Sequence, residues 1–195
     1  MPRNPAPGRS QHGYSLVEVV VASAVLGVVL TIIFGALTSF QTAYSRSAAR
    51  DDAIDQAHLA EQDLGNQITS GNVLYAPGGN GTSLVVYTQT NGSWDCVEWE
   101  VSQGGDLTTR SWSQGYPGDG SSPTSWRTVA TDIVNTSSEA PFVRPSTFSN
   151  RLINIDLYVN ETGSSANPVQ VETSVEGRNT EYGYPTSACI TVPPG

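Results

Sequence analysis

The chain has 195 residues, a length that suits one globular domain with an appended segment. Its eighteen acidic residues outnumber nine basic ones, and the net charge is −9. So acidic a chain would repel a phosphate backbone or an anionic lipid surface, which argues against sequence-independent nucleic-acid binding.

Residues 1–13 are polar, broken by prolines and basic through Arg3 and Arg9. A secretory signal has its small-residue cut site after an apolar core, whereas the candidate site here, Gly13, comes before the apolar run. We therefore expect residues 1–13 to be a different kind of leader. Its removal would leave seven basic residues against eighteen acidic ones, a net charge of −11.

The run that follows, Leu16 to Leu37, is long enough for a helix to cross about 30 Å of hydrocarbon, and we expect a membrane helix over residues 14–38. Arg3 and Arg9 on the leading side predict a cytoplasmic N-terminus. The run holds one charge, Glu18, which would cost roughly 2.5–3.5 kcal/mol at the helix centre and less near the end. Such acids are usually functional, although an acid near the interface could also reach water.

Gly13-Tyr14-Ser15-Leu16-Val17-Glu18 resembles the prepilin motif of type IV pilins and type II secretion pseudopilins. The resemblance implies that a membrane-embedded prepilin peptidase cuts after Gly13 and methylates the new amine of Tyr14. It implies also that the Glu18 carboxylate pairs with the N-terminal amine of a neighbouring subunit, which would relieve the desolvation of both charges. Many major pilins have a proline about twenty residues into the mature stem, where this chain has Gly35.

Helical periodicity continues beyond the apolar run, so residues 39–70 are expected to form an amphipathic continuation of the helix. Apolar positions that recur at helical intervals form the stripe: Ala48, Ile54, Ala57, Leu59, Leu64 and Ile68. Gly65 is a weak point in this pattern, and Ser70-Gly71-Asn72 is typical of a helix end.

Short strands are predicted from residue 71 to residue 195, the expected extracytoplasmic head domain. A hairpin is expected around Asn91-Gly92, and a second one joins the alternating segments Arg151–Val159 and Val169–Glu176 across residues 160–168. Other expected strands are Val73–Tyr75, Ser83–Thr88, Trp94–Val101, Asp106–Trp112 and part of Trp126–Val134. The fold class is α+β: a long N-terminal helix, membrane-spanning in its first half, packed on an antiparallel sheet.

Within the pilin family, the strand layout resembles the larger minor subunits, the J-type pseudopilins and W-type minor pilins. Three segments carry this second resemblance: the hairpin around Trp99 to Leu107, the strand near Arg151, and Thr173 to Asn179.

The two cysteines, Cys96 and Cys189, lie far apart in a domain that we expect to be exported, which favours one disulfide. Such a bond would tie the tail to the middle of the domain and contribute roughly 4 kcal/mol, less any strain. Two buried free thiols are the other interpretation.

Catalytic and metal-binding patterns are scarce. Of the two histidines, His12 lies in the leader and His58 on the polar side of the stem, so no Ser-His-Asp triad, cofactor site or multi-histidine metal site is expected. Glu98 and Glu100 share a strand face that we expect to be solvated. Calcium is a lesser alternative for loop carboxylates: Asp95, Asp106, Asp119 and Asp156. Trp94, Trp99, Trp112 and Trp126 are core candidates, the last two being alternatively contact residues beside a Gly/Pro/Ser loop.

Three functional classes remain. The favoured one is a non-catalytic minor pilin or pseudopilin in the inner membrane. Its expected partners are other subunits through the N-terminal helix, prepilin peptidase and the inner-membrane assembly platform, with no nucleic acid. A tip adhesin or DNA-uptake pilin is the alternative, and a membrane-tethered enzyme is the least favoured class.

Overall fold

The computed structural model describes residues 14–90, 92–136, 138–148, 151–161, 164–178 and 183–194. The chain divides into two compact units, Met1–Ser45 and Arg46–Gly195. The predicted leader, residues 1–13, lies outside the described residues.

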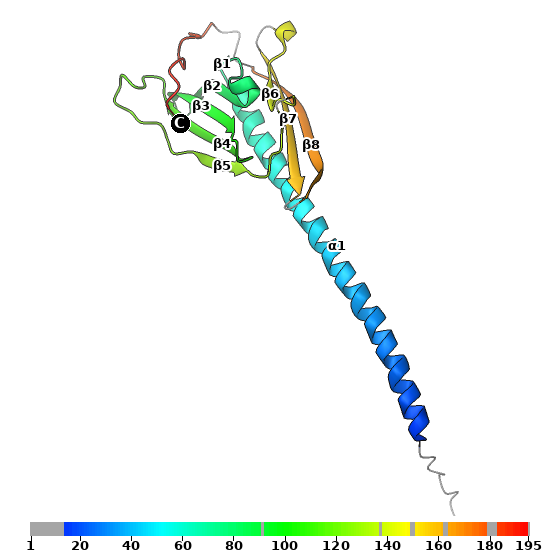
Figure 1. The fold of residues 1–195 in the computed structure, drawn as a ribbon. Helices are drawn as coiled ribbons and strands as arrows, with labels where there is room; N and C mark the ends of the chain where they lie inside the picture. Colours follow the sequence, from blue (N-terminus) through cyan, green and yellow to red (C-terminus); the bar gives the residue numbers. More distant parts are fainter. Residues whose placement is uncertain are drawn as a thin grey trace, which may run out of the picture. The chain divides into compact units, whose positions relative to one another are not determined.

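One long helix, α1 (Leu16–Ser70), begins the described chain and is drawn from blue to cyan in Figure 1. Hydroxyl groups within its apolar part donate back to the helix, as when Thr31 Oγ1 donates to the carbonyl of Gly27 at 2.9 Å and Ser39 Oγ to that of Gly35 at 3.0 Å. These bonds satisfy polar groups without any outside partner. The expected helical stem, including its course through Gly65, is confirmed.

The end of α1 is set by close packing at Gly71. A Cβ at this position would lie 2.7 Å from Cγ1 of Val86 and 3.0 Å from the carbonyl oxygen of Ile68, so a side chain has no room. The Gly71 N–H donates to that same Ile68 carbonyl at 3.0 Å and closes the last turn. The predicted stop at Ser70-Gly71-Asn72 is confirmed.

A five-stranded antiparallel sheet follows in the second unit. Its strands are β1 (Val73–Leu74), β2 (Ser83–Thr90), β3 (Ser93–Val101), β4 (Leu107–Ser113) and β5 (Arg127–Ala130), in the order β1-β2-β3-β4-β5 (Figure 1). The register Thr90↔Ser93 confirms the predicted hairpin, in which Asn91 itself lies outside the described residues. Because every strand pairs with its sequence neighbour, this sheet is a simple meander.

A second, three-stranded antiparallel sheet was not foreseen as separate. It consists of β6 (Phe142–Val143), β7 (Leu152–Glu161) and β8 (Ser164–Glu176), in that order. β6 is too short to show any alternation in the sequence. The expected connection over residues 160–168 was wrong, because Glu161 pairs with Ser164 and β8 begins there. Backbone pairing thus extends the hairpin beyond the part whose polarity alternates.

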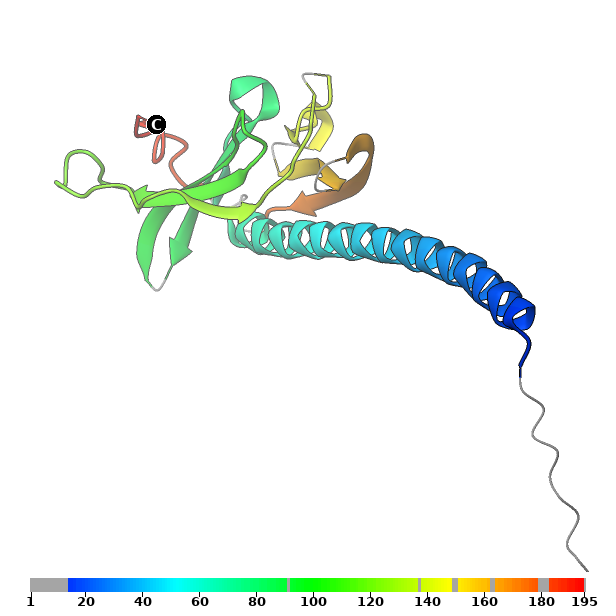
Figure 2. The same ribbon diagram turned by 60° about the horizontal axis from the view of Figure 1, so that its bottom comes forward.

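The main core of the second unit lies where the C-terminal end of α1 meets both sheets (Figures 1 and 2). The helix contributes Ala60, Leu64 and Ile68, spaced by four residues on one face. Ala57, on the same face, packs in a smaller cluster with Val159 and Val171. The sheets contribute large apolar side chains, all buried: Leu84, Val86, Trp99, Leu107, Phe142, Ile153, Ile155 and Leu157. The predicted packing of a helical stripe on antiparallel strands is therefore confirmed for Ala57, Leu64 and Ile68. It was wrong for Leu59, which is 63% exposed, and for Ala48, which is also exposed.

The opposite face of the first sheet has a smaller core of its own. Because side chains alternate along a strand, Cys96 and Trp112 point away from α1 and pack with Tyr87 and Cys189. The C-terminal segment, which has no regular secondary structure among its described residues, covers this face.

One short segment joins the two sheets. Ile133 N–H donates to the carbonyl of Gly105 at 2.8 Å, and Val134 N–H donates to that of Tyr158 at 2.7 Å. The preceding residue, Asp132, has φ 61°, a left-handed conformation that Asp tolerates better than most residues. The chain can therefore leave the first sheet and bond to the second within two residues.

Candidate assembly and processing site

The start of α1 is capped by Ser15. Its hydroxyl oxygen accepts the N–H of Glu18 at 3.3 Å, and its carbonyl accepts the same N–H at 3.0 Å and that of Val19 at 3.3 Å. Ser15 thus satisfies donors that the first helical turn leaves free. Ser15 and Glu18 have the spacing of a capping box, a local signal in the sequence that the motif interpretation had passed over.

Glu18 is consequently placed where the helix itself favours an anion. It is the acid of the first turn, and the N-terminal end of the helix dipole stabilises negative charge there. Its side chain and that of Tyr14 are both exposed, Tyr14 by 82%. Gly13 lies outside the described residues. The carboxylate is thus stabilised locally and stays accessible.

The apolar part of α1 is exposed all round. Leu16 is 80% exposed, Ile32 66% and Phe34 61%, and none of the most apolar eighteen-residue stretch is buried. Such a surface is unfavourable in water and requires lipid or other apolar helices around it. By length and composition this helix can cross a membrane.

The head contains the predicted disulfide. Cys96 and Cys189 are joined, with their Cα atoms 5.8 Å apart, so the free-thiol interpretation is overturned. The backbone N–H of Cys189 also donates to Tyr75 Oη at 3.0 Å. Burial raises the pKa of Tyr75 despite this hydrogen bond, so the phenol stays neutral. The disulfide attaches the C-terminal segment to β3, and the hydrogen bond attaches it to Tyr75.

A buried ion pair lies one rung further along the same sheet face. Glu98 and Arg110 are opposite each other on β3 and β4, their charged atoms are 2.8 Å apart, and both side chains are less than 10% exposed. Burial raises the pKa of Glu98, while the hydrogen bond and charge of Arg110 act in the opposite direction. The expected solvated face was wrong for Glu98, because the C-terminal segment covers it, and Glu100 is half-buried.

The tryptophans divide into two groups. Trp99 and Trp112 are buried in the two cores, which confirms them as core residues and excludes Trp112 as an exposed contact residue. Trp94 and Trp126 are half-buried, and Trp126 stacks on the guanidinium of Arg110 with its ring centroid 4.2 Å from Cζ. The side chain of His58 is 59% exposed and lies 3.3 Å from Glu61, as expected for stem surface.

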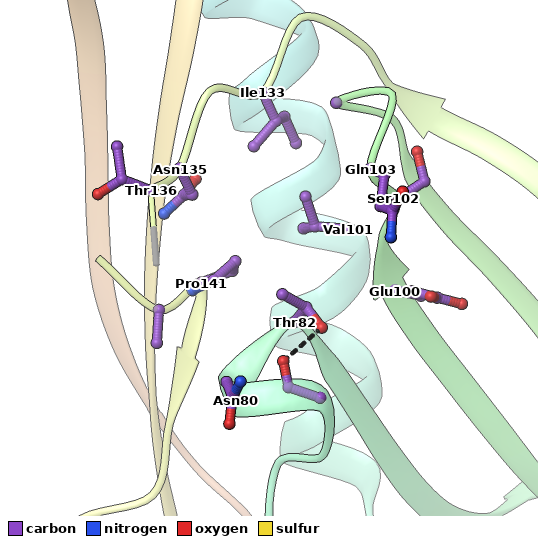
Figure 3. A pocket seen from close by; sticks show the side chains of 13 residues that line it. Asn80, Thr82, Glu100, Val101, Ser102, Gln103, Ile133, Asn135, Thr136 and Pro141 are labelled. Atoms are coloured by element: carbon purple, nitrogen blue, oxygen red, sulfur yellow. Dashed lines mark hydrogen bonds between the residues drawn. The ribbon is translucent and has the colours of Figure 1, made fainter. Parts of the chain in front are cut away.

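A pocket of about 430 Å³ lies between the two sheets (Figure 3). Asn135 and Thr136 line one side, Ser102 and Gln103 the other, with Ile133 between them. The polar groups of Asn135 are already engaged, because its amide donates to the carbonyl of Asp156 at 2.7 Å and its oxygen accepts the Tyr158 N–H at 3.0 Å. Ser102 Oγ accepts two backbone N–H groups of its own turn. The polar atoms of Asn135 and Ser102 in this pocket therefore hold the fold together, and we assign the pocket a structural role.

Two of the carboxylates considered as calcium ligands, those of Asp119 and Asp156, accept hydrogen bonds within the fold. Asp119 accepts from the Ser113 hydroxyl at 2.6 Å and the Ser121 N–H at 2.9 Å, and these hydrogen bonds lower its pKa to about 2. Asp156 accepts from the Gln170 amide at 3.0 Å. Within the described part of the chain, no three His, Cys, Asp or Glu residues form a group that could hold a metal ion.

Residues 8–34 match the family model of the prokaryotic N-terminal methylation motif. No curated protein matches the chain significantly. The matched residues include Gly13, Tyr14 and Glu18 and continue into the exposed apolar helix, which supports anchoring in the inner membrane and processing by prepilin peptidase. Type IV pilins and pseudopilins, which carry a motif of this kind, are generally structural and non-catalytic subunits. The chain thus carries, at its N-terminus, the methylation motif of the type IV pilin and pseudopilin family.

Proposed function

We propose that this protein is a non-catalytic minor subunit that is built into, or initiates, a type IV pilus or a type II secretion pseudopilus. The observation that carries the proposal is the apolar helix after the methylation motif, exposed all round and bearing a single acid, Glu18. A helix of this kind leaves the membrane only when equivalent helices replace the lipid around it.

Processing creates the group that Glu18 needs. Cleavage after Gly13 frees the amine of Tyr14, four residues before Glu18. When helices stack, the carboxylate of one subunit pairs with the methylated amine of the next, and each charge compensates the desolvation of the other. The Ser15 cap supports this role, because it holds the first turn of the helix in a defined conformation.

The proposed organisation has four parts: leader 1–13, membrane and assembly helix 14–38, amphipathic continuation 39–70, and head 71–195. The N-terminus faces the cytoplasm, as Arg3 and Arg9 favour, and the head is extracytoplasmic. The disulfide supports that orientation, since such bonds persist in oxidising compartments. The proposed partners are other subunits, prepilin peptidase and the assembly platform. The J-type or W-type assignment rests on the strand layout.

Tip adhesion or DNA uptake is the alternative function. Exposed apolar side chains on the head favour an adhesive role, with Ile190 69% exposed and Val192 44% exposed. The net charge of −11 after cleavage disfavours DNA as a direct ligand. Whole-cell adhesion that is lost on deletion while fibres persist in normal number would favour this alternative.

The assembly role is tested with Glu18→Ala in the native host. We expect cleavage after Gly13 to remain and incorporation into fibres or pseudopili to fall strongly, as measured by immunoblotting of the sheared fraction. Asp55→Ala removes an exposed acid of the same helix outside the apolar part and serves as the control. Normal incorporation of Glu18→Ala would contradict the pairing mechanism.

A further inference from the structure

The C-terminal segment crosses two adjacent rungs of the first sheet. Cys96 is opposite Trp112, and Glu98 is opposite Arg110, so both pairs present side chains on the same face. Cys189 is bonded to Cys96 on the first rung. The chain then continues to the second rung, where the ion pair lies.

Arg110 divides its donors between the ion pair and the tail. Its Nε donates to Glu98 Oε2 at 2.8 Å. Its Nη2 donates to the carbonyl of Pro193 at 2.6 Å, and its Nη1 donates to that of Pro194 at 3.0 Å. The ring of Trp126 lies against the guanidinium, 4.2 Å from its centre. The guanidinium of Arg110 therefore binds two consecutive main-chain carbonyls at once.

The chemistry of Arg110 and of the two prolines favours these hydrogen bonds even when the disulfide is open. A buried guanidinium is costly when its N–H groups lack acceptors, and the tail supplies two of them. Prolines suit the position because they offer carbonyl acceptors but no N–H groups that would need partners of their own. The tail and Arg110 thus satisfy each other.

The hydrogen bonds from Arg110 to the prolines also restrict Cys189, because Cys189 is close to them along the chain. The last strand, β8, ends at Glu176, thirteen residues before Cys189. Upstream, the ring of Tyr184 packs on Trp94 five residues before Cys189, which leaves roughly 17 Å of chain between them. Downstream, the four residues from Cys189 to Pro193 can span at most about 14 Å. Docking of the prolines therefore holds Cys189 from its second side and raises its effective concentration near Cys96.

We propose that Arg110 is a positioning residue for the Cys96–Cys189 disulfide, because it docks the carbonyls of Pro193 and Pro194 before the two thiols are joined. In the covalent step, the thiolate of one cysteine attacks an external disulfide such as oxidised glutathione and releases one glutathione thiol. The second cysteine displaces the other glutathione. The protein loses two electrons and two protons, and glutathione disulfide gains them as two thiols.

The test measures the equilibrium constant of this exchange for the full chain in detergent micelles. The chain has only two cysteines, so maleimide labelling after acid quenching counts the open form directly at each glutathione ratio. Arg110→Lys keeps the charge beside Glu98 but removes the fork. We expect the constant to fall about ten- to a hundredfold, since each lost hydrogen bond is worth roughly a factor of ten or less.

A chain that ends at Ile190 provides the second variant, because it removes the docked prolines and leaves the ion pair intact. It should show the same fall, and Arg110→Lys in this shortened chain should have no further effect. Arg127→Lys, on the neighbouring strand with its side chain 63% exposed, is the matched control and should leave the constant unchanged.

Two results would overturn the proposal. One is a shortened chain that forms the disulfide as readily as the full chain. The other is an Arg110→Lys effect of equal size in both chain lengths, which would show that Arg110 acts only through the fold of the sheet. Near-UV circular dichroism reports whether each reduced variant is folded, and if Arg110→Lys is not, the shortened chain alone decides.

Discussion

The two units of the molecule treat apolar side chains in opposite ways. In the first unit, residues such as Val25 and Leu26 are each 58% exposed, whereas in the second unit Leu64 and Ile68, on the same helix, are completely buried. The first unit must take its apolar surroundings from outside the chain, and the second makes its own from two sheets. One continuous helix therefore has two environments: its first part needs apolar partners from outside the chain, and its last part is buried by the chain's own sheets.

The largest expected effect concerns the first unit. Gly13→Val should abolish cleavage, because a branched side chain at the cut site cannot follow the bare glycine backbone into a narrow active site. The head should fold as before. N-terminal sequencing and mobility on gels measure the cleavage, and a variant that is still cut at residue 13 would refute this assignment.

The next effect should fall on the second unit alone. Replacing Cys96 and Cys189 together by Ser opens a loop of 93 residues and should lower the free energy of unfolding by roughly 4 kcal/mol. All four tryptophans lie in the head, so their near-UV signal during denaturant unfolding reports this unit specifically. An unchanged midpoint would show that the reduced tail is already held as firmly as the oxidised one.

A matched pair of conservative changes compares the units directly. Ile68→Val removes one methyl group from a fully buried position and should cost about 1 kcal/mol, or about 2–4 °C in Tm. Ile32→Val makes the same change at a position that is 66% exposed and should leave the tryptophan-monitored Tm unchanged. Equal effects would break the distinction between the two units.

The smallest effect concerns the exposed loop around Asp119. Its pKa, lowered from 3.8 to about 2, means that hydrogen bonding favours the ionised form in the folded protein. Its contribution to stability is therefore present above pH 3.8 and lost as the pH falls through about 2. Ser113→Ala removes the first of these hydrogen bonds and should raise the pKa of Asp119 toward 3.8, as measured by carboxyl NMR titration. An unmoved titration would exclude Ser113 as the cause.

Several parts of this fold could be predicted because they depend on near neighbours. The stem follows from a periodic apolar pattern that ends in Ser70-Gly71-Asn72, and the first hairpin follows from a two-residue turn between alternating segments. The meander β2 to β4 was predicted within one or two residues for the same reason. Local conformational preference and side-chain period suffice for such elements.

Other parts could not be predicted because no local sequence pattern marks the contacts that form them. Glu98 belongs to an acidic pattern that normally lies in solvent, and only its register with Arg110 makes it a buried ion pair. β6 has two residues and no pattern, and it forms because β7 offers a partner at Ile155. The ion-pair partners are only twelve residues apart, but the tail that covers them lies more than eighty residues away from Arg110.

The sequence by itself determined the processing motif, the exposed apolar helix and the presence of a β-rich head, because each depends on spacing within a short stretch. Only the tertiary structure decided that the strands form two sheets, and that the tail lies over Glu98 and Arg110. The physical reason is burial. A charged pair and two proline carbonyls become a site only when chain segments more than eighty residues apart exclude water together.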